Sequence, residues 1–227
     1  MSLYLPIIAV LFGFLLAYFL KAKTKNITLL LAFSGGFLLT VTILELLPDI
    51  YQFGNARISG LFIIGGIILQ IALEYLSGGA EHGHLHLDEN DNHFPILLFV
   101  SLCIHSLFEG FPTTERDHLL LGVIVHKIPV AFILSTFLLN SVLSKTKIFL
   151  FIVIFALMTP LGSFISLNFN DDIGQYQIYI EAIVVGIFLH ISSTILFESS
   201  KQHKFDYLKV ISILTGIGLA VLLSLGH

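Results

Sequence analysis

Eight long apolar segments, separated by short polar connections, run along this chain. A helix needs about 20 mainly apolar residues to cross a bilayer, and each segment is close to that length. Of the 227 residues, 56% are hydrophobic and 11% are Asp, Glu, Lys or Arg, against about 25% charged residues in soluble domains. So little charge excludes a soluble globular enzyme and a disordered chain, and it predicts an all-α integral membrane protein. The expected transmembrane helices cover residues 3–20, 27–47, 58–77, 95–112, 119–140, 148–167, 177–197 and 208–226.

The positive charges predict the orientation of this single domain, residues 1–227. Lys and Arg gather on the cytoplasmic side of membrane proteins. With the N-terminus outside, eight lysines lie in or beside the cytoplasmic connections, and only Arg57 and Arg116 lie on the opposite side. Eight helices then leave both termini outside. The eight lysines are Lys21, Lys23, Lys25, Lys145, Lys147, Lys201, Lys204 and Lys209.

Charge and cysteine content exclude two further classes. The net charge is −4, whereas nucleic-acid binding needs clustered Lys and Arg, so no nucleic-acid partner is expected. Cys103 is the single cysteine. It excludes an internal disulfide and a zinc site built from several thiolates.

Ionisable residues inside the fourth and fifth segments indicate a metal site between these two helices. His105 and Glu109 are four residues apart and share one helix face. In a hairpin of the two segments, His126 lies at a similar depth. Two imidazoles and a carboxylate suit Zn²⁺, with a fourth position for water or Ser106, and Fe²⁺, Mn²⁺ or Cd²⁺ would also fit. The alternative is structural hydrogen bonding across the bundle.

Lys127 follows His126 directly, and two interpretations of it stay open. The ammonium group either pairs with an acid such as Glu109, or it occupies the position that a second metal ion would take. A cation beside the site argues against a second metal ion in both cases.

These residues resemble the ZIP (Zrt/Irt-like) family of metal transporters. The stretch His105-Ser106-Leu107-Phe108-Glu109-Gly110, followed by His126-Lys127, is similar to the subgroup with H-S-x-x-E-G in span four and H-K in span five. The resemblance implies eight helices with both termini outside, a homodimer, and import of Zn²⁺ or a related metal. It also implies His105, Glu109 and His126 as ligands with Ser106 adjacent, and Lys127 as the replacement of a second-metal ligand. Weaker similarity covers Gly36-Phe37-Leu38, Glu45-Leu46-Leu47-Pro48-Asp49, Leu157-Met158-Thr159-Pro160-Leu161-Gly162 and Gly186-Ile187-Phe188-Leu189.

Acidic residues near the outer ends of two helices are candidate entrance ligands. Glu45 and Asp49 are four residues apart near the end of the second segment, and Glu181 lies near the start of the seventh. Carboxylates there would attract a cation, although acids at helix ends are also ordinary interfacial residues. His190, deeper in the seventh segment, either lines the route or hydrogen-bonds to a neighbour.

The cytoplasmic connection at about residues 78–94 is rich in histidine. His82, His84, His86 and His93 share this loop with four acidic residues, which predicts a loop that receives released metal transiently. A solvated polar loop is the alternative.

Together these features favour a zinc transporter that is not an enzyme and uses no organic cofactor. The alternatives are a membrane-embedded zinc hydrolase, for which the sequence has no H-E-x-x-H motif, and a metal sensor. A multi-pass location in a bacterial cytoplasmic membrane is expected.

Overall fold

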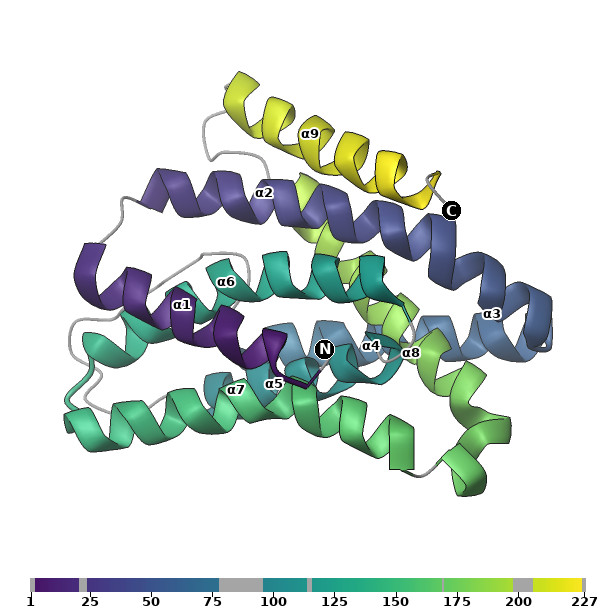
Figure 1. The fold of residues 1–227 in the computed structure, drawn as a ribbon, viewed down its shortest axis with the longest axis horizontal. Helices are drawn as coiled ribbons and strands as arrows, with labels where there is room; N and C mark the ends of the chain where they lie inside the picture. The colour runs from purple at the N-terminus through teal and green to yellow at the C-terminus, as the bar shows by residue number, and fades with distance from the viewer. Residues whose placement is uncertain are drawn as a thin grey trace.

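The chain folds into a bundle of helices in the computed structural model, which describes residues 3–20, 24–77, 96–113, 116–168, 170–197 and 206–225. The helices lie roughly side by side along one long axis (Figure 1). They are α1 (Leu5–Leu20), α2 (Thr24–Val41), η1 (Thr42–Leu46), α3 (Leu47–Phe53), α4 (Ala56–Ser77), α5 (Ile96–Gly110), η3 (Phe111–Thr113), α6 (Asp117–Leu139), α7 (Lys145–Asn168), α8 (Asn170–Phe197) and α9 (Tyr207–Ser224).

Seven of the described helical segments are long and apolar enough to cross a membrane. An eighth apolar helix, Leu5–Phe19, is shorter. The 16 residues of α1 extend about 24 Å at 1.5 Å per residue, less than the hydrocarbon thickness of about 30 Å. The described residues therefore confirm the expected all-helical architecture with several apolar helices, consistent with an integral membrane protein. On length alone, the structure identifies seven candidate spans where the sequence predicts eight.

The expected second span is longer than predicted and contains an irregular turn. It runs from Ile27 to Phe53 through α2, η1 and α3. The middle element, η1, is a single π-helical segment with Glu45 in its first turn. Such π segments occur often at functional sites. The following α3 has Pro48 as its second residue. The backbone is already helical at Leu46 and Leu47, so Pro48, which has no N–H, leaves one backbone hydrogen bond of this continuous helix unmade.

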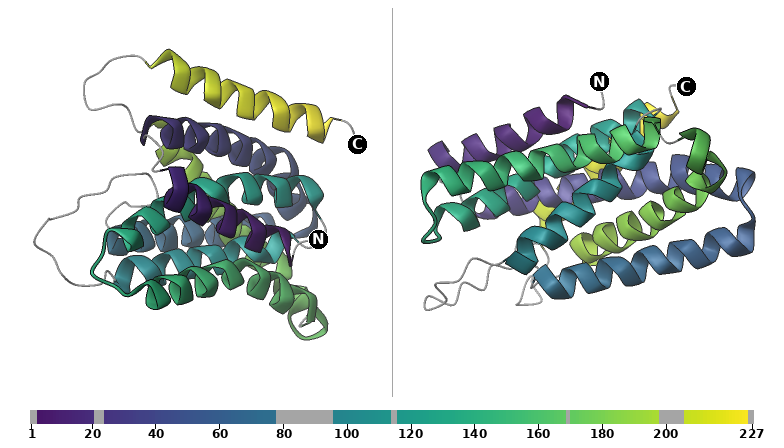
Figure 2. Two further views of the ribbon diagram at one scale, coloured as in Figure 1. Left: turned by 60° about the vertical axis from the view of Figure 1, so that its left-hand side comes forward. Right: turned by 90° about the horizontal axis from the view of Figure 1, so that it is seen from below.

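The start of α1 and the end of α9 lie toward the same end of the bundle in the right-hand view of Figure 2. We call this end, which also holds α3, η3 and the first turn of α6, the α3 end. The connections after α2–α3 and after η3 turn at this end.

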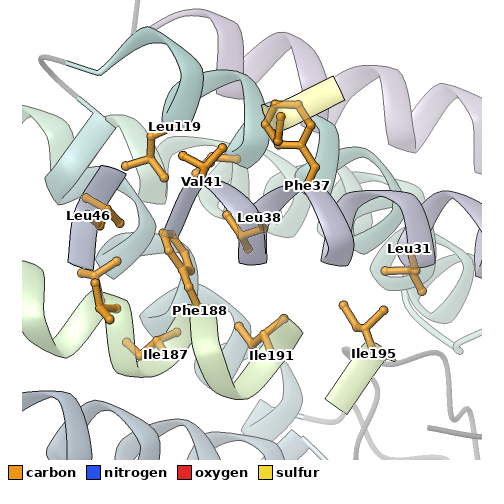
Figure 3. Packing of buried hydrophobic residues seen from close by; sticks show 14 of the residues in the cluster. Leu31, Phe37, Leu38, Val41, Leu46, Leu119, Ile187, Phe188, Ile191 and Ile195 are labelled. Atoms are coloured by element: carbon orange, nitrogen blue, oxygen red, sulfur yellow. The ribbon is translucent and has the colours of Figure 1, made fainter. Parts of the chain in front are cut away.

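Apolar side chains pack in two clusters around the polar residues of the bundle. One joins α1, α5, α6 and α7 and includes Val10, Leu102, Leu134 and Phe155. The other is centred on α2 and α8 and reaches α4, α6 and α9. Figure 3 shows the second cluster, where side chains from α2, α6 and α8 meet. Because α6 contributes to both clusters, its polar residues lie between them.

Two glycines allow α5 and α7 to approach closely. A Cβ atom at Gly110 would collide with the backbone oxygen of Thr159, and one at Gly162 would collide with that of Leu107. Small residues permit such backbone contact between membrane helices. The contact brings Thr159 beside the candidate ligands of α5.

Candidate metal centre

His105, Glu109 and His126 meet in the interior of the bundle. His105 and Glu109 lie one turn apart on α5, and His126 lies on α6. One ligand atom from each of the three side chains lies within 4.8 Å of the others, and the exposed fractions of these residues are 2%, 1% and 1%. The expected juxtaposition in the α5–α6 hairpin is thus present.

The Glu109 carboxylate has two different neighbours. Its Oε1 lies 2.9 Å from Nε2 of His105, and its Oε2 accepts a hydrogen bond from Nζ of Lys127. Lys127 is 2% exposed, and its Nζ lies 5.0 Å from the ring centre of Phe155, a favourable cation–π position. Of the two interpretations of Lys127, the structure therefore contains the ion pair with Glu109.

Ser106 and Thr159 hold the lysine in place through a chain of hydrogen bonds. Lys127 Nζ donates to Ser106 Oγ at 2.6 Å. The Thr159 hydroxyl lies 2.9 Å from the Ser106 carbonyl and 3.0 Å from the Ser106 hydroxyl. Because a hydroxyl has one proton, Thr159 donates to the carbonyl and Ser106 donates to Thr159. The Ser106 oxygen is therefore engaged on the lysine side of Glu109.

The orientation of the His126 ring depends on a serine of α2. The Ser34 hydroxyl donates to the Leu31 carbonyl at 2.9 Å, and its oxygen lies 3.3 Å from Nδ1 of His126. With its proton directed to Leu31, Ser34 acts as an acceptor, so Nδ1 carries the proton. A neutral His126 then has its lone pair on Nε2, the form in which imidazole binds a metal.

The three groups can bind one divalent cation between α5 and α6. A tetrahedral Zn²⁺ has bonds of about 2.0–2.2 Å, which puts its ligand atoms about 3.3 Å apart. The observed spread of 4.8 Å leaves only a small contraction. A metal bound to Nε2 of His105 would replace the present contact with Glu109. It would leave Glu109 Oε2 on Lys127, so the site suits a single metal ion.

Asp49 and Glu181, two of the expected entrance residues, share one arginine at the α3 end. Arg116 Nη2 lies 3.1 Å from Asp49 Oδ2, and its Nη1 lies 3.1 Å from Glu181 Oε2. Gln177 Nε2 donates to Glu181 Oε1 at 3.2 Å. The two carboxylates, which are on α3 and α8, are thus brought together by the residue that precedes α6.

Glu45 has different partners. His118 Nδ1 donates to Glu45 Oε1 at 3.0 Å, and the Ser224 hydroxyl donates to the same oxygen at 2.7 Å. His118 is on the first turn of α6, and Ser224 is the last residue of α9. Three segments of the chain therefore meet at this carboxylate.

His190 on α8 contacts Glu74 on α4. The distance from His190 Nε2 to Glu74 Oε2 is 2.6 Å, and the two side chains are 18% and 26% exposed. The expected hydrogen bond from His190 to a neighbour is therefore present. A role of His190 in lining the transport route stays a prediction. The expected metal-receiving histidines, His82, His84, His86 and His93, lie outside the described residues.

Sequence reasoning missed the partners of several site residues. Glu74 carried a usable signal, since an ionisable residue inside an apolar segment is a functional candidate. Small hydroxyl residues carry no such signal in membrane helices, and helix-end polar residues are ordinary. The missed partners are Ser34, Glu74, Arg116, His118, Thr159 and Ser224.

Comparison with known proteins gives a consistent result. The family model described as ZIP Zinc transporter matches residues 81–224. Zinc transporter ZIP1 of Danio rerio is 29% identical over 155 residues, covering 63% of this chain and 51% of that protein. Zinc transporter ZIP1 of Homo sapiens is 26% identical over 253 residues, covering 87% and 78%. Protein zntD of Dictyostelium discoideum is 24% identical over 163 residues, covering 63% and 24%. The chain spans about half the length of the Danio rerio relative.

Proposed function

This chain belongs to the ZIP zinc transporter family, and from that premise we propose that it carries Zn²⁺ across the membrane into the cytoplasm. The observation that carries the proposal is the buried cluster of His105, Glu109 and His126 on two apolar helices, α5 and α6. Buried ionisable residues in membrane helices are costly and mark ion pathways. The relatives named as zinc transporters support the same metal.

We assign the binding groups as follows. His105, Glu109 Oε1 and His126 Nε2 bind the cation, and water fills the fourth position. An incomplete protein ligand set allows exchange, which transport requires and a closed structural site does not. Fe²⁺, Mn²⁺ and Cd²⁺ are further cations that this donor set would accept.

Lys127 limits the site to one metal ion in this proposal. Its ammonium group neutralises Glu109 Oε2 and stands where a second cation would bind. Ser106, which the sequence suggested as a ligand, positions Lys127 instead, because its oxygen already accepts from Nζ. The bonds to Thr159 support this assignment.

The proposed route runs from the α3 end, taken as the outer side, to the opposite end of the bundle. Glu45, Asp49 and Glu181 attract the cation at the outer side, and a rearrangement of the site-bearing helices then exposes it to the cytoplasm. His190 lies along the later part of the route. The histidines between residues 78 and 94 receive the released ion.

We propose the following topology, assembly and location for the protein. It has eight transmembrane segments, of which the one formed by α1 is the shortest, both termini outside, and a homodimeric assembly. The chain is a multi-pass membrane protein. A bacterial cytoplasmic membrane remains the prediction for its location, although the relatives named above are eukaryotic.

Zinc uptake into proteoliposomes loaded with a zinc-sensitive dye tests the proposal. The informative variant is His126→Gln, which removes a ligand while keeping a polar side chain of similar size. Ser101→Ala is the matched control, because Ser101 is buried on α5 and its hydroxyl bonds within that helix to the Leu98 carbonyl. Thermal unfolding in detergent establishes that each variant is folded.

We expect saturable Zn²⁺ entry with the wild-type chain and with Ser101→Ala, and loss of entry with His126→Gln. Folded wild-type protein that binds zinc without moving it into vesicles would contradict transport. That result would favour a metal sensor or a zinc-dependent hydrolase. Undiminished uptake by His126→Gln would contradict the site assignment alone.

A further inference from the structure

Arg116 makes two ion pairs at once at the α3 end. Its two terminal nitrogens each lie 3.1 Å from a carboxylate oxygen, one of Asp49 and one of Glu181. The side chain of Glu181 is 5% exposed, that of Arg116 is 22% exposed and that of Asp49 is 38% exposed. We call these three residues the Arg116 cluster. A planar guanidinium can bond two carboxylates simultaneously, which a lysine ammonium does less well.

The position of Arg116 in the chain connects this cluster to the metal centre. The residue immediately precedes α6, which carries His126, and it follows α5 and η3. Asp49 and Glu181 lie on α3 and α8, which are separate from the α5–α6 hairpin. Movement of the hairpin relative to α3 and α8 must therefore break or rearrange both ion pairs.

The charges of the cluster bear directly on cation entry. Asp49 and Glu181 supply two negative charges, of which Glu181 is buried and needs a partner. The Arg116 guanidinium supplies a positive charge that pairs with both carboxylates in place of a metal ion. While the guanidinium bonds both carboxylates, a divalent cation cannot use the same oxygens without displacing it.

We infer that Arg116 is a positioning residue for transport, whose guanidinium occupies Asp49 and Glu181 until an incoming divalent cation takes its place. This inference rests on the proposed function and on the α3 end facing outward. Displacement of Arg116 breaks its two ion pairs to α3 and α8, so cation entry and movement of the helices that carry the site are linked.

Equilibrium binding of Zn²⁺ to the full chain in detergent, measured by titration calorimetry, tests the competition independently of transport. The main variant is Arg116→Gln, and Arg57→Gln is the matched control because Arg57 is an exposed arginine at the start of α4, beside the α3 end. The double variant Arg116→Gln/Glu181→Gln also removes Glu181, one of the two carboxylates that the loss of Arg116 leaves without its ion pair. The metal centre and the histidine-rich segment are present in every variant, so differences between variants report the cluster.

We expect Arg116→Gln to bind Zn²⁺ about tenfold more tightly at the α3 end, the size of effect that removal of a charged hydrogen-bond competitor gives. The double variant should lose this gain, and Arg57→Gln should match the wild type. Unchanged or weaker binding by folded Arg116→Gln would overturn the inference. If Arg116→Gln does not fold, Arg116→Lys decides. Its single ammonium leaves one carboxylate available, so tighter binding supports the inference and wild-type binding overturns it.

Uptake kinetics distinguish a role of Arg116 in transport from a purely structural role. Arg116→Gln should lower the external Zn²⁺ concentration for half-maximal uptake, whereas simple loss of folded protein would lower only the maximal rate. An unchanged half-maximal concentration would overturn the linkage to transport. If no variant takes up zinc, the wild type included, the proposed function fails while the binding result still decides the competition.

Discussion

Replacement of Lys127 by methionine gives a direct test of the charge balance in the metal centre. Methionine keeps an unbranched chain of similar length and removes the positive charge. Glu109 Oε2 and Ser106 Oγ then lose their donor, while Glu109 Oε1 keeps its contact with His105 at 2.9 Å. Removing one partner of a buried ion pair costs about 3–5 kcal/mol. Since His105 remains, we expect a loss near the lower end of that range without metal.

Zinc should recover much of the stability that Lys127→Met loses, because the metal replaces the missing positive charge at Glu109. A ligand at a hundred times its dissociation constant stabilises a folded protein by about 2.7 kcal/mol. In Glu109→Gln the loss without metal is similar, since Lys127 stays buried without its counter-charge. Zinc cannot restore that variant because a ligand is missing.

The assay is unfolding in detergent, with and without Zn²⁺, for Lys127→Met, Glu109→Gln and the double variant. The loss of stability in the double variant should be smaller than the sum of the two single losses by about 1–3 kcal/mol, since no unpaired charge remains. Lys145→Met, at the exposed start of α7, controls for loss of a lysine and should leave stability unchanged. A loss under about 1 kcal/mol in Lys127→Met, or no response of that variant to zinc, would refute the reasoning.

Three further outcomes are expected. Gly162→Ala should destabilise the protein by about 1–3 kcal/mol in the same unfolding assay, because its Cβ collides with the α5 backbone. Gly65→Ala is the control, since nothing lies within 4 Å of its Cβ. Equal losses of stability in the two variants would contradict the importance of this close packing. Ser34→Ala should weaken zinc binding about 10–100-fold, because the proton on Nδ1 of His126 loses its acceptor. Calorimetry measures the zinc affinity, with Ser101→Ala as the control. A wild-type affinity in Ser34→Ala would show that the serine does not orient the His126 ring. Metal removal by a chelator should lower the unfolding temperature of the wild type but not that of His126→Gln, and an equal decrease in both would place the stabilising metal elsewhere.

The membrane helices and the core of the metal site could be predicted because both depend on local patterns. Apolar runs of spanning length identify helices wherever the chain goes afterwards. Helical periodicity alone puts His105 and Glu109 on one face, and a short connection between α5 and α6 lets their side chains meet, although α5 packs chiefly on α7 and α6 chiefly on α1. His126 then needs only similar depth to meet the other two.

The interhelical partners depend on how distant segments rotate and cross, which no local pattern records. Arg116 meets Asp49, 67 positions away along the chain, and Ser34 meets His126 across 92 positions. Thr159 reaches the ligands of α5 because two glycines let α5 and α7 touch. Hydropathy and spacing therefore define which groups are buried and at what depth. The pairing of each carboxylate with a basic side chain depends on side-chain packing between helices. A charged side chain in a bundle can pair with any opposite charge that the folded helices bring within reach.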